Sequence, residues 1–171
     1  FHEAIEREIV PILHEQAEKR KKSFALNSLK PWDLDVDVSG KAALKPFKNG
    51  GELIEKSIQC FSNISRYLGE RLEIMKENKL FDVESRKGKA PGGYNYPLAE
   101  TGAPFIFMNS ANTFRDLTTM VHEGGHAVHT FLTADLELND FKHCPSEVAE
   151  LASMSMELIS MENWDVYFDD E

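Results

Sequence analysis

The sequence of 171 residues is poor in cysteine and in positive charge: it has two cysteines, 19 Lys and Arg against 29 Asp and Glu, and a formal net charge of −10. Cys60 and Cys144 are too few for the disulfide framework of a small secreted domain. An acidic chain of this kind is not expected to bind nucleic acid. The sequence also lacks an apolar run of membrane-spanning length and a visible signal peptide. We therefore expect a cytoplasmic protein that does not contact membranes.

One short motif carries most of the chemical information: His122-Glu123-Gly124-Gly125-His126, an H-E-x-x-H sequence. On a helix, residues four apart lie nearly above one another, so His122 and His126 would point in the same direction. That spacing lets two imidazoles bind one Zn²⁺, while Glu123 lies close enough to accept a proton from a metal-bound water. The motif predicts the catalytic zinc site of a peptidase. The alternative at this point is a chance pair of histidines on a helix.

The surrounding residues favour a helix from residue 113 to about 133. Thr113 is a suitable N-cap, with Asp116 in the capping-box position. Gly124 and Gly125 each cost a helix about 1 kcal/mol relative to alanine, which indicates that a neighbouring backbone or a substrate comes close there. Apolar residues recur at mostly helical spacing, namely Phe114, Leu117, Met120, Val121, Val128, Phe131 and Leu132.

Elsewhere the pattern predicts a mostly α-helical protein of the α+β class. Residues 2–22 are expected to form a helix interrupted at Pro11, and residues 52–78 a long core helix. A last helix is expected to carry Pro145 at its first position. The whole of residues 1–171 is expected to form one partial domain. Three short strands are expected to form a small antiparallel sheet beside the motif helix, at residues 81–83, 94–96 and 105–109.

The strand at 105–109 leads by a short turn into the motif helix, which places it beside the predicted metal. As an edge strand it could bind a peptide backbone by adding it as a further strand. The preceding glycine-rich loop carries three cations but lacks the order of a phosphate-binding loop. A mobile hairpin connection is one interpretation of this loop. The candidate substrate-binding residues are Gly92, Gly93, Tyr94 and His129.

Catalytic zinc sites usually have three protein ligands and one open position, so a third ligand is needed. The longer motif H-E-x-x-H-x-x-G-x-x-H is excluded because residues 129 and 132 are His and Leu. Candidates in other elements are Asp135, Asp140, His143, Glu147, Glu150 and Glu157. Glu150 is the first choice, because a carboxylate within an apolar helix is costly unless it is paired or metal-bound. Glu147 is the reserve, with helix capping as its other role, and Glu157 could orient a ligand from outside the coordination shell.

Two long segments, 121–129 and 144–153, together with Glu157, resemble the M3 family of zinc oligopeptidases. That family includes thimet oligopeptidase and the oligoendopeptidases F, and the sequence is most similar to the latter. The segments 29–34 and 86–89 also resemble family segments, so the resemblance extends from near residue 10 to about residue 164.

The resemblance implies a zincin-like core of the gluzincin type, with one Zn²⁺ per chain. It implies His122, His126 and Glu150 as the zinc ligands and Glu123 as the general base. Glu147 would act from outside the coordination shell, in competition with the capping role. The implied reaction is the hydrolysis of peptide bonds in short peptides by a zinc-activated water.

Family members are several times longer than this chain, which is therefore expected to be the zinc-site core of a larger peptidase. A tyrosine- and histidine-bearing segment that contacts substrate in the family has no counterpart here, so the isolated chain is expected to be slow or inactive. The remainder of the parent chain is an expected partner. The competing hypothesis is a zinc-binding structural or interaction domain, in which His129, His143 or a cysteine closes the fourth coordination position.

Overall fold

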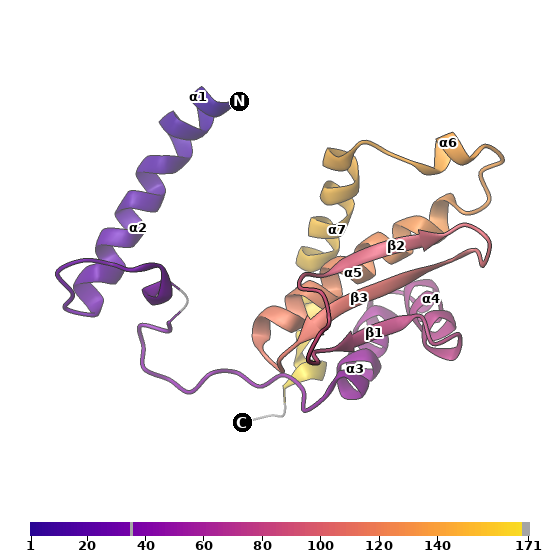
Figure 1. Ribbon diagram of the computed structural model, residues 1–171, viewed down its shortest axis with the longest axis horizontal. Coiled ribbons are helices and arrows are strands. Elements are labelled where there is room, and N and C mark those ends of the chain that lie inside the picture. Colours follow the sequence, from indigo (N-terminus) through magenta and orange to yellow (C-terminus); the bar gives the residue numbers. More distant parts are fainter. Residues whose placement is uncertain (35, 169–171) are drawn as a thin grey trace. The chain divides into compact units, whose positions relative to one another are not determined.

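The computed structural model describes residues 1–34 and 36–168, and the chain divides into two units, Phe1–Ala43 and Leu44–Glu171 (Figure 1). The first unit is built on one helical segment. The second holds the three strands and the H-E-x-x-H helix. A single partial domain over residues 1–171 stays a prediction.

The helical segment of the first unit is irregular where Pro11 predicts an interruption. Helix α1 (His2–Ala4) continues through a π-helical stretch, Ile5–Ile9, into α2 (Val10–Ser23). Proline has no N–H to donate, which removes one α-helical hydrogen bond. The turns before Pro11 are widened accordingly, as is typical of π-helical insertions.

The single helix predicted over residues 52–78 is wrong, because two helices, α3 (Gly50–Ile64) and α4 (Arg66–Glu77), meet at Ser65. Ser65 has an extended backbone, with φ −161° and ψ 135°. Its N–H still closes the last turn of α3, and its carbonyl accepts a hydrogen bond from the first turn of α4. The apolar stripe continues across the break, so hydrophobic periodicity could not reveal it. Its fully buried members are Leu53, Phe61, Leu72 and Met75.

Three strands lie where the sequence predicts them: β1 (Phe81–Glu84), β2 (Tyr94–Leu98) and β3 (Ala103–Ser110). Their order in the sheet is β1-β3-β2, with β2 antiparallel and β1 parallel to β3. The prediction of an antiparallel sheet is therefore right for one pair and wrong for the other. Because β1 and β2 are not neighbours, the glycine-rich loop between them is not a hairpin. The expected edge strand is also wrong, because β3 is central and β1 and β2 lie at the two edges.

The glycine-rich loop is anchored to β1 by Lys89, whose side chain is fully buried. Its Nζ donates to the backbone carbonyls of Asp82 and Glu84, each at 2.8 Å, and to the Asp82 carboxylate at 2.9 Å. Hydrogen bonds from Arg86, and then from Lys89, lower the pKa of the Asp82 carboxyl to about 2. A buried lysine with this many partners does not fit the expected mobile connection, because moving the loop would leave its charge unpaired.

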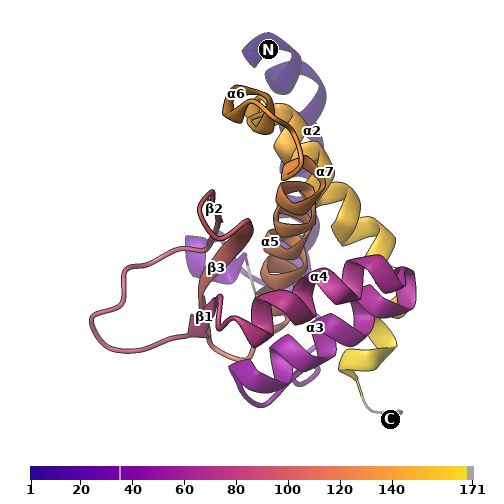
Figure 2. The ribbon, with the colours of Figure 1, turned by 90° about the vertical axis from the view of Figure 1, so that its right-hand side faces the viewer.

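Helix α5 (Phe114–Thr133) is the central element of the second unit. In Figure 2 it lies between the sheet on one side and helices α3, α4 and α7 (Ser146–Ser160) on the other. The short helix α6 (Asn139–Lys142) connects α5 to α7, and a 3₁₀ stretch, Met161–Tyr167, follows. Helix α7 begins one residue later than predicted, with Pro145 as its N-cap. The core around α5 includes Leu53, Phe61, Leu72, Met75, Ile106, Met108, Leu117, Met120, Val121 and Tyr167.

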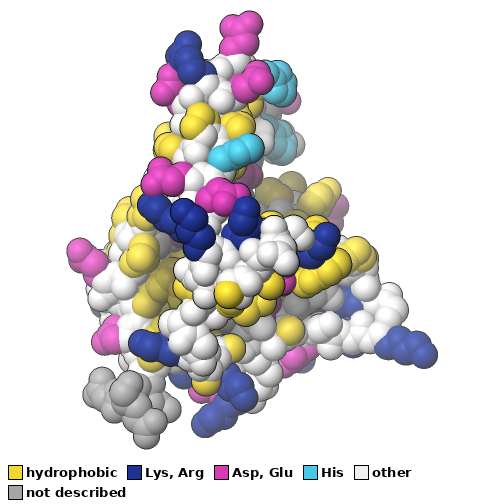
Figure 3. Space-filling view, turned by 90° about the vertical axis from the view of Figure 1, so that its left-hand side faces the viewer, with side chains coloured by type: hydrophobic (Ala, Val, Ile, Leu, Met, Phe, Trp, Pro, Cys, Tyr) yellow, Lys and Arg dark blue, Asp and Glu magenta, His cyan; other side chains and the backbone are white. Residues whose placement is uncertain are grey.

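Charged side chains of both signs are interspersed over the face of the molecule seen in Figure 3. Along α2, for example, Lys19 pairs with Glu15 at 2.7 Å and Lys21 with Glu18 at 2.8 Å. Within residues 1–34 and 36–168, no helix has the length and apolar character needed to cross a bilayer.

Candidate metal centre

Helix α5 begins with the capping box that the sequence predicts. The Thr113 hydroxyl accepts a hydrogen bond from the Asp116 N–H at 3.4 Å, and the Asp116 carboxylate accepts one from the Thr113 N–H at 2.8 Å. This pairing satisfies two of the backbone donors that a helix leaves free at its start. Further along, His122 and His126 lie on one face of α5, with ring centroids 4.8 Å apart.

The two glycines of the motif lie where neighbouring helices come closest to α5. A Cβ atom at Gly125 would lie 2.9 Å from the Cα of Ser153 and 2.9 Å from the Cβ of Met156, both on α7. One at Gly124 would lie 2.8 Å from the Phe61 ring of α3. The close approach predicted from the glycine pair is confirmed, and the neighbour at Gly125 is a helix backbone. Glycine thus lets α7 come near enough for its side chains to reach the histidines.

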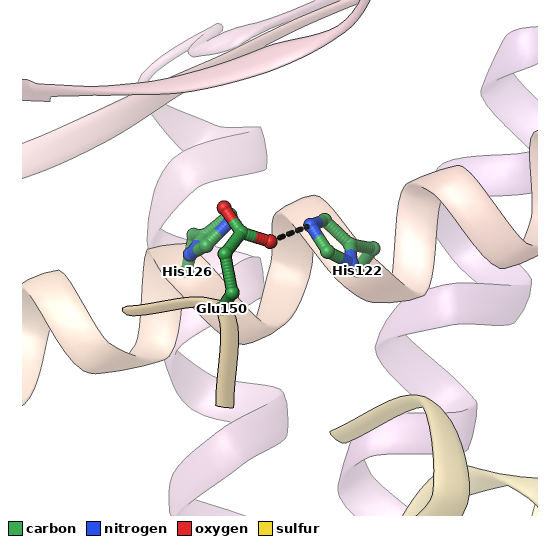
Figure 4. A group of neighbouring side chains, drawn as sticks. All are labelled: His122, His126 and Glu150. Carbon is green, nitrogen blue, oxygen red and sulfur yellow. Dashed lines mark ion pairs between the residues drawn. The ribbon is translucent and has the colours of Figure 1, made fainter. Parts of the chain in front are cut away.

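Glu150 of α7 lies against both histidines of α5 (Figure 4). Its two carboxylate oxygens are 3.3 Å from His122 Nε2 and 3.6 Å from His126 Nε2. One ligand atom from each of the three residues lies within 4.8 Å of the other two. Two ligand atoms about 2.0–2.2 Å from a tetrahedral metal ion are about 3.3–3.6 Å apart. The two histidine–Glu150 distances match that spacing, each with a different carboxylate oxygen, and the limit of 4.8 Å for one atom from each residue is somewhat wider. The structure therefore brings together the three residues predicted as ligands.

Glu157 reaches His122 from the other side of the ring. Its Oε1 lies 2.6 Å from His122 Nδ1. A hydrogen bond donated by Nδ1–H leaves Nε2 with the lone pair, and Nε2 is the nitrogen that faces Glu150. A carboxylate at this position could orient the imidazole for metal binding without itself being a ligand. The contact agrees with the position predicted for Glu157, and its role stays a prediction.

Glu123 is buried beside this group, with 7% of its surface exposed. Burial raises the pKa of its carboxyl, whereas His122 and the backbone amide of Asn95 on β2 act in the opposite direction. Burial likewise lowers the pKa of His126, which favours the neutral imidazole that can bind a metal. Sequence reasoning missed Asn95, because its contribution comes from a backbone group and no residue type signals it.

No further histidine, cysteine or carboxylate joins the group within the part of the chain that the structure describes. Cys144 is exposed, and Cys60 is buried, with the pKa of its thiol raised to about 11 by burial. His129 and His143 line a cavity beside His126 instead. The group offers three protein ligands, which leaves one position of a tetrahedral ion for water.

The remaining candidates for substrate contact lie on the loop and sheet. The Tyr94 ring stacks on Phe107, with centroids 4.9 Å apart, and the Gly92 carbonyl accepts a hydrogen bond from Asn109 at 3.0 Å. These contacts hold the end of the loop against β3. The roles of Gly92, Gly93, Tyr94 and His129 in substrate binding stay predictions.

The first turn of α7 does not have the cap expected of Glu147. Glu147 is exposed there, and no side-chain hydrogen bond caps the helix among the described residues. The alternative role of Glu147, beside the metal but outside its coordination shell, stays a prediction.

The surroundings of Glu150 differ from the buried apolar helix that the sequence predicts. Its side chain is 48% exposed, and apolar neighbours such as Leu151 and Leu158 are 67% and 70% exposed. The face of α7 that meets α5 carries Ser153 instead, because the close contact with Gly125 leaves little room for a larger side chain. The burial argument for Glu150 is therefore wrong, although the residue does lie beside both histidines.

Comparison with known proteins gives a consistent family assignment. The model of "Peptidase family M3" matches residues 1–169. An oligoendopeptidase F homolog of Lactococcus lactis subsp. lactis is 31% identical over 160 residues, which are 94% of this chain and 26% of the relative. The oligopeptidase PepF of Bacillus subtilis is 30% identical, over 88% of this chain and 22% of its own.

Solved structures agree with the sequence relatives. PZ peptidase A with an inhibitor has a TM-score of 0.89 and 30% identity, over 97% of this chain and 29% of the other. A putative oligoendopeptidase F from Bacillus anthracis has a TM-score of 0.88 and 25% identity, over 99% of this chain and 31% of the other. The chain therefore spans about a quarter of the length of the curated relatives it matches.

We expect Gly125→Ala to destabilise the chain more than Gly124→Ala. At Gly125 the new methyl group meets the backbone of α7, which can yield only if the helix moves, whereas at Gly124 it meets the end of one ring. Overpacking of this kind costs about 1–3 kcal/mol, against about 1 kcal/mol gained in helix propensity. Urea denaturation followed by circular dichroism would compare the two variants. Equal stabilities, or the reverse order, would contradict the close contact between α5 and α7.

Proposed function

The chain belongs to peptidase family M3, and on that premise we propose that it carries the catalytic zinc centre of a metalloendopeptidase that hydrolyses short peptides. One observation carries the proposal: two imidazoles of α5 and one carboxylate of α7 bring ligand atoms within 4.8 Å of one another, with the buried Glu123 beside them. The names oligoendopeptidase and oligopeptidase of the relatives support short peptides as the substrate class.

In the proposed site, His122, His126 and Glu150 would hold one Zn²⁺ per chain. When bound, zinc supplies Lewis-acid chemistry at a peptide carbonyl and makes a water acidic enough to lose a proton near neutral pH. Two imidazole nitrogens and one carboxylate oxygen form a donor set that suits this ion.

The side chains of the chain itself would orient the ligands and move the proton. Glu157 accepts a hydrogen bond from the Nδ1–H of His122 and so holds that ring with Nε2 toward Glu150. Glu123 would act as the general base that accepts a proton from the attacking water and later delivers it to the leaving amine. Burial raises the pKa of Glu123, and a base whose pKa lies closer to neutrality transfers protons in both directions more effectively.

A zinc-binding structural domain without catalytic activity is the other function that the sequence leaves open. It would need a fourth protein ligand, for which His129, His143 and the cysteines are the candidates. None of them joins the group among the described residues, and this favours a site open to water.

We also propose that further peptidase chain covers the exposed apolar side of α7. Leu151, Met154 and Leu158 are all more than half exposed there, and the relatives are about four times longer than this chain. Contiguous apolar surface of this kind marks a site of interaction with other protein. A cytoplasmic location stays a prediction.

The ligand assignment predicts different effects of two substitutions on the same helix. Glu150→Gln should weaken Zn²⁺ binding by more than about 100-fold, because ligand loss exceeds the 10–100-fold effect of outer groups. Glu147→Gln, one turn earlier, should change it much less. Competition with a chromogenic chelator would measure both affinities. If the two variants retain zinc equally, Glu150 is not a ligand.

The role of Glu123 predicts a separation of metal binding from turnover. Glu123→Gln should keep the zinc affinity and lower hydrolysis of a fluorogenic short peptide by about 10²–10⁴-fold, because only the proton acceptor is lost. The substitution would be tested in this chain and at the matching glutamate of a full-length relative. Unchanged turnover in the relative would exclude Glu123 as the base, and loss of zinc would show that it contributes to metal binding.

A further inference from the structure

A cavity of about 260 Å³ opens directly beside His126, between strand β2, helix α5 and the segment around α6. It continues into a second hollow of about 240 Å³ that shares Thr130, Lys142 and His143 with it. The two form one groove that leads away from the candidate metal centre. Figure 1 shows the three elements that border it. A substrate that reaches the metal group would have part of its chain next to this groove.

The groove differs in charge from the chain as a whole. The sequence has 29 Asp and Glu against 19 Lys and Arg, yet no carboxylate of residues 1–34 or 36–168 lines either hollow. Its basic side chains are Lys142, His143 and His129, together with His126 at the metal end, and Cys144 lies among them. A cleft lined by donors and a cation, in an otherwise acidic protein, attracts anionic groups.

Asn95 adds an unused donor to the wall of the groove. Its side-chain oxygen lies 3.4 Å from the Thr130 hydroxyl, while its Nδ2 is buried without a hydrogen-bond partner among the described residues. A buried amide donor without a partner costs about 1–3 kcal/mol. Because Nδ2 is closed off from solvent, a ligand oxygen would reach it only after the amide group turns toward the groove. The backbone amide of the same residue lowers the pKa of Glu123, which places Asn95 near that carboxylate.

We propose that this groove binds a carboxylate group of the peptide substrate, with Lys142 as the charged partner and the Asn95 amide as a further donor. The inference rests on the proposed peptidase function and specifies its substrate class as peptides that carry an anion close to the cleaved bond. That carboxylate comes either from the free C-terminus of a short peptide or from an acidic side chain. Charge-assisted hydrogen bonds of this kind are shorter and stronger than neutral ones, and they would fix the register of the peptide.

The test uses metal-free protein, so that binding is measured without hydrolysis. Nuclear magnetic resonance titrations would follow the Asn95 side-chain amide and the backbone amides of Lys142 and His143. The probes are N-acetyl-triglycine as the free acid and as the amide, and N-acetyl-Gly-Asp-Gly-amide. At least one carboxylate-bearing probe should shift these signals and bind about tenfold more tightly than the neutral amide, a typical contribution of one charged hydrogen bond.

Two lysine variants test the assignment to the groove. Lys142→Gln keeps a donor but removes the charge, and it should abolish the advantage of the carboxylate probes. Lys79→Gln, just after α4 and outside the groove, should leave the advantage of the carboxylate probes unchanged. The probe that responds identifies the source of the carboxylate. Equal binding of all three probes, or an advantage that survives Lys142→Gln, would overturn the inference.

The binding test can succeed or fail independently of whether the protein catalyses hydrolysis. Because the isolated chain is expected to be slow or inactive, zinc binding is measured beside the probes: discrimination between the probes by a chain that binds no Zn²⁺ would contradict the proposed metal centre alone. Hydrolysis without discrimination would contradict the groove inference alone.

Discussion

The contact between Gly125 of α5 and Ser153 of α7 is the constraint on which the rest of the site depends. No side chain larger than hydrogen fits at Gly125 without moving the α7 backbone. Ser153 is flanked on its own helix by Glu150, three residues before it, and by Glu157, four residues after it. Residues at these spacings lie on one face of a helix. One close contact between two backbones therefore brings both carboxylates to His122, one on each of its ring nitrogens.

Placing several carboxylates around the two histidines has an electrostatic cost that a cation would offset. Three carboxylates, Glu123, Glu150 and Glu157, lie around two imidazoles, and Glu150 raises the pKa of the buried Glu123 further. The glycine pair that permits the contact also lowers the stability of α5 by about 2 kcal/mol in propensity. Such local conflicts are expected at functional sites, where a sequence gives up stability for a required geometry. A divalent ion among these groups would convert their mutual repulsion into attraction.

Features with a local chemical cause could be predicted from the sequence. The Thr113 and Asp116 capping box, the helix that holds the H-E-x-x-H motif and the three strands follow from short-range hydrogen bonding and side-chain patterns. The close approach at Gly125 could be predicted too, because glycine in a helix needs a reason. Glu150 lies beside the histidines, as the sequence predicts. Its side chain is half exposed, however, so the burial that was used to select it is absent.

Features set by tertiary contacts could not be predicted. The extended backbone of Ser65 breaks a helix without changing the apolar stripe, and the parallel pairing of β1 depends on how the loop at Lys89 crosses the sheet. The apolar pattern of α7 also does not show which side meets α5, because Ser153 is buried there while Leu151 and Leu158 are exposed. Asn95 contributes a backbone amide to Glu123, and one sequence carries no signal for it.

The central claim is that this chain alone holds an open three-ligand metal centre, and zinc K-edge X-ray absorption of the chain loaded with one Zn²⁺ tests it most directly. The account predicts a four-coordinate ion with nitrogen and oxygen neighbours at about 2.0–2.2 Å, two of them imidazoles, and no sulfur. Addition of a hydroxamate should change the spectrum, because it would displace the water at the open position. A sulfur neighbour at about 2.3 Å, or a third imidazole with no response to the hydroxamate, would contradict the account.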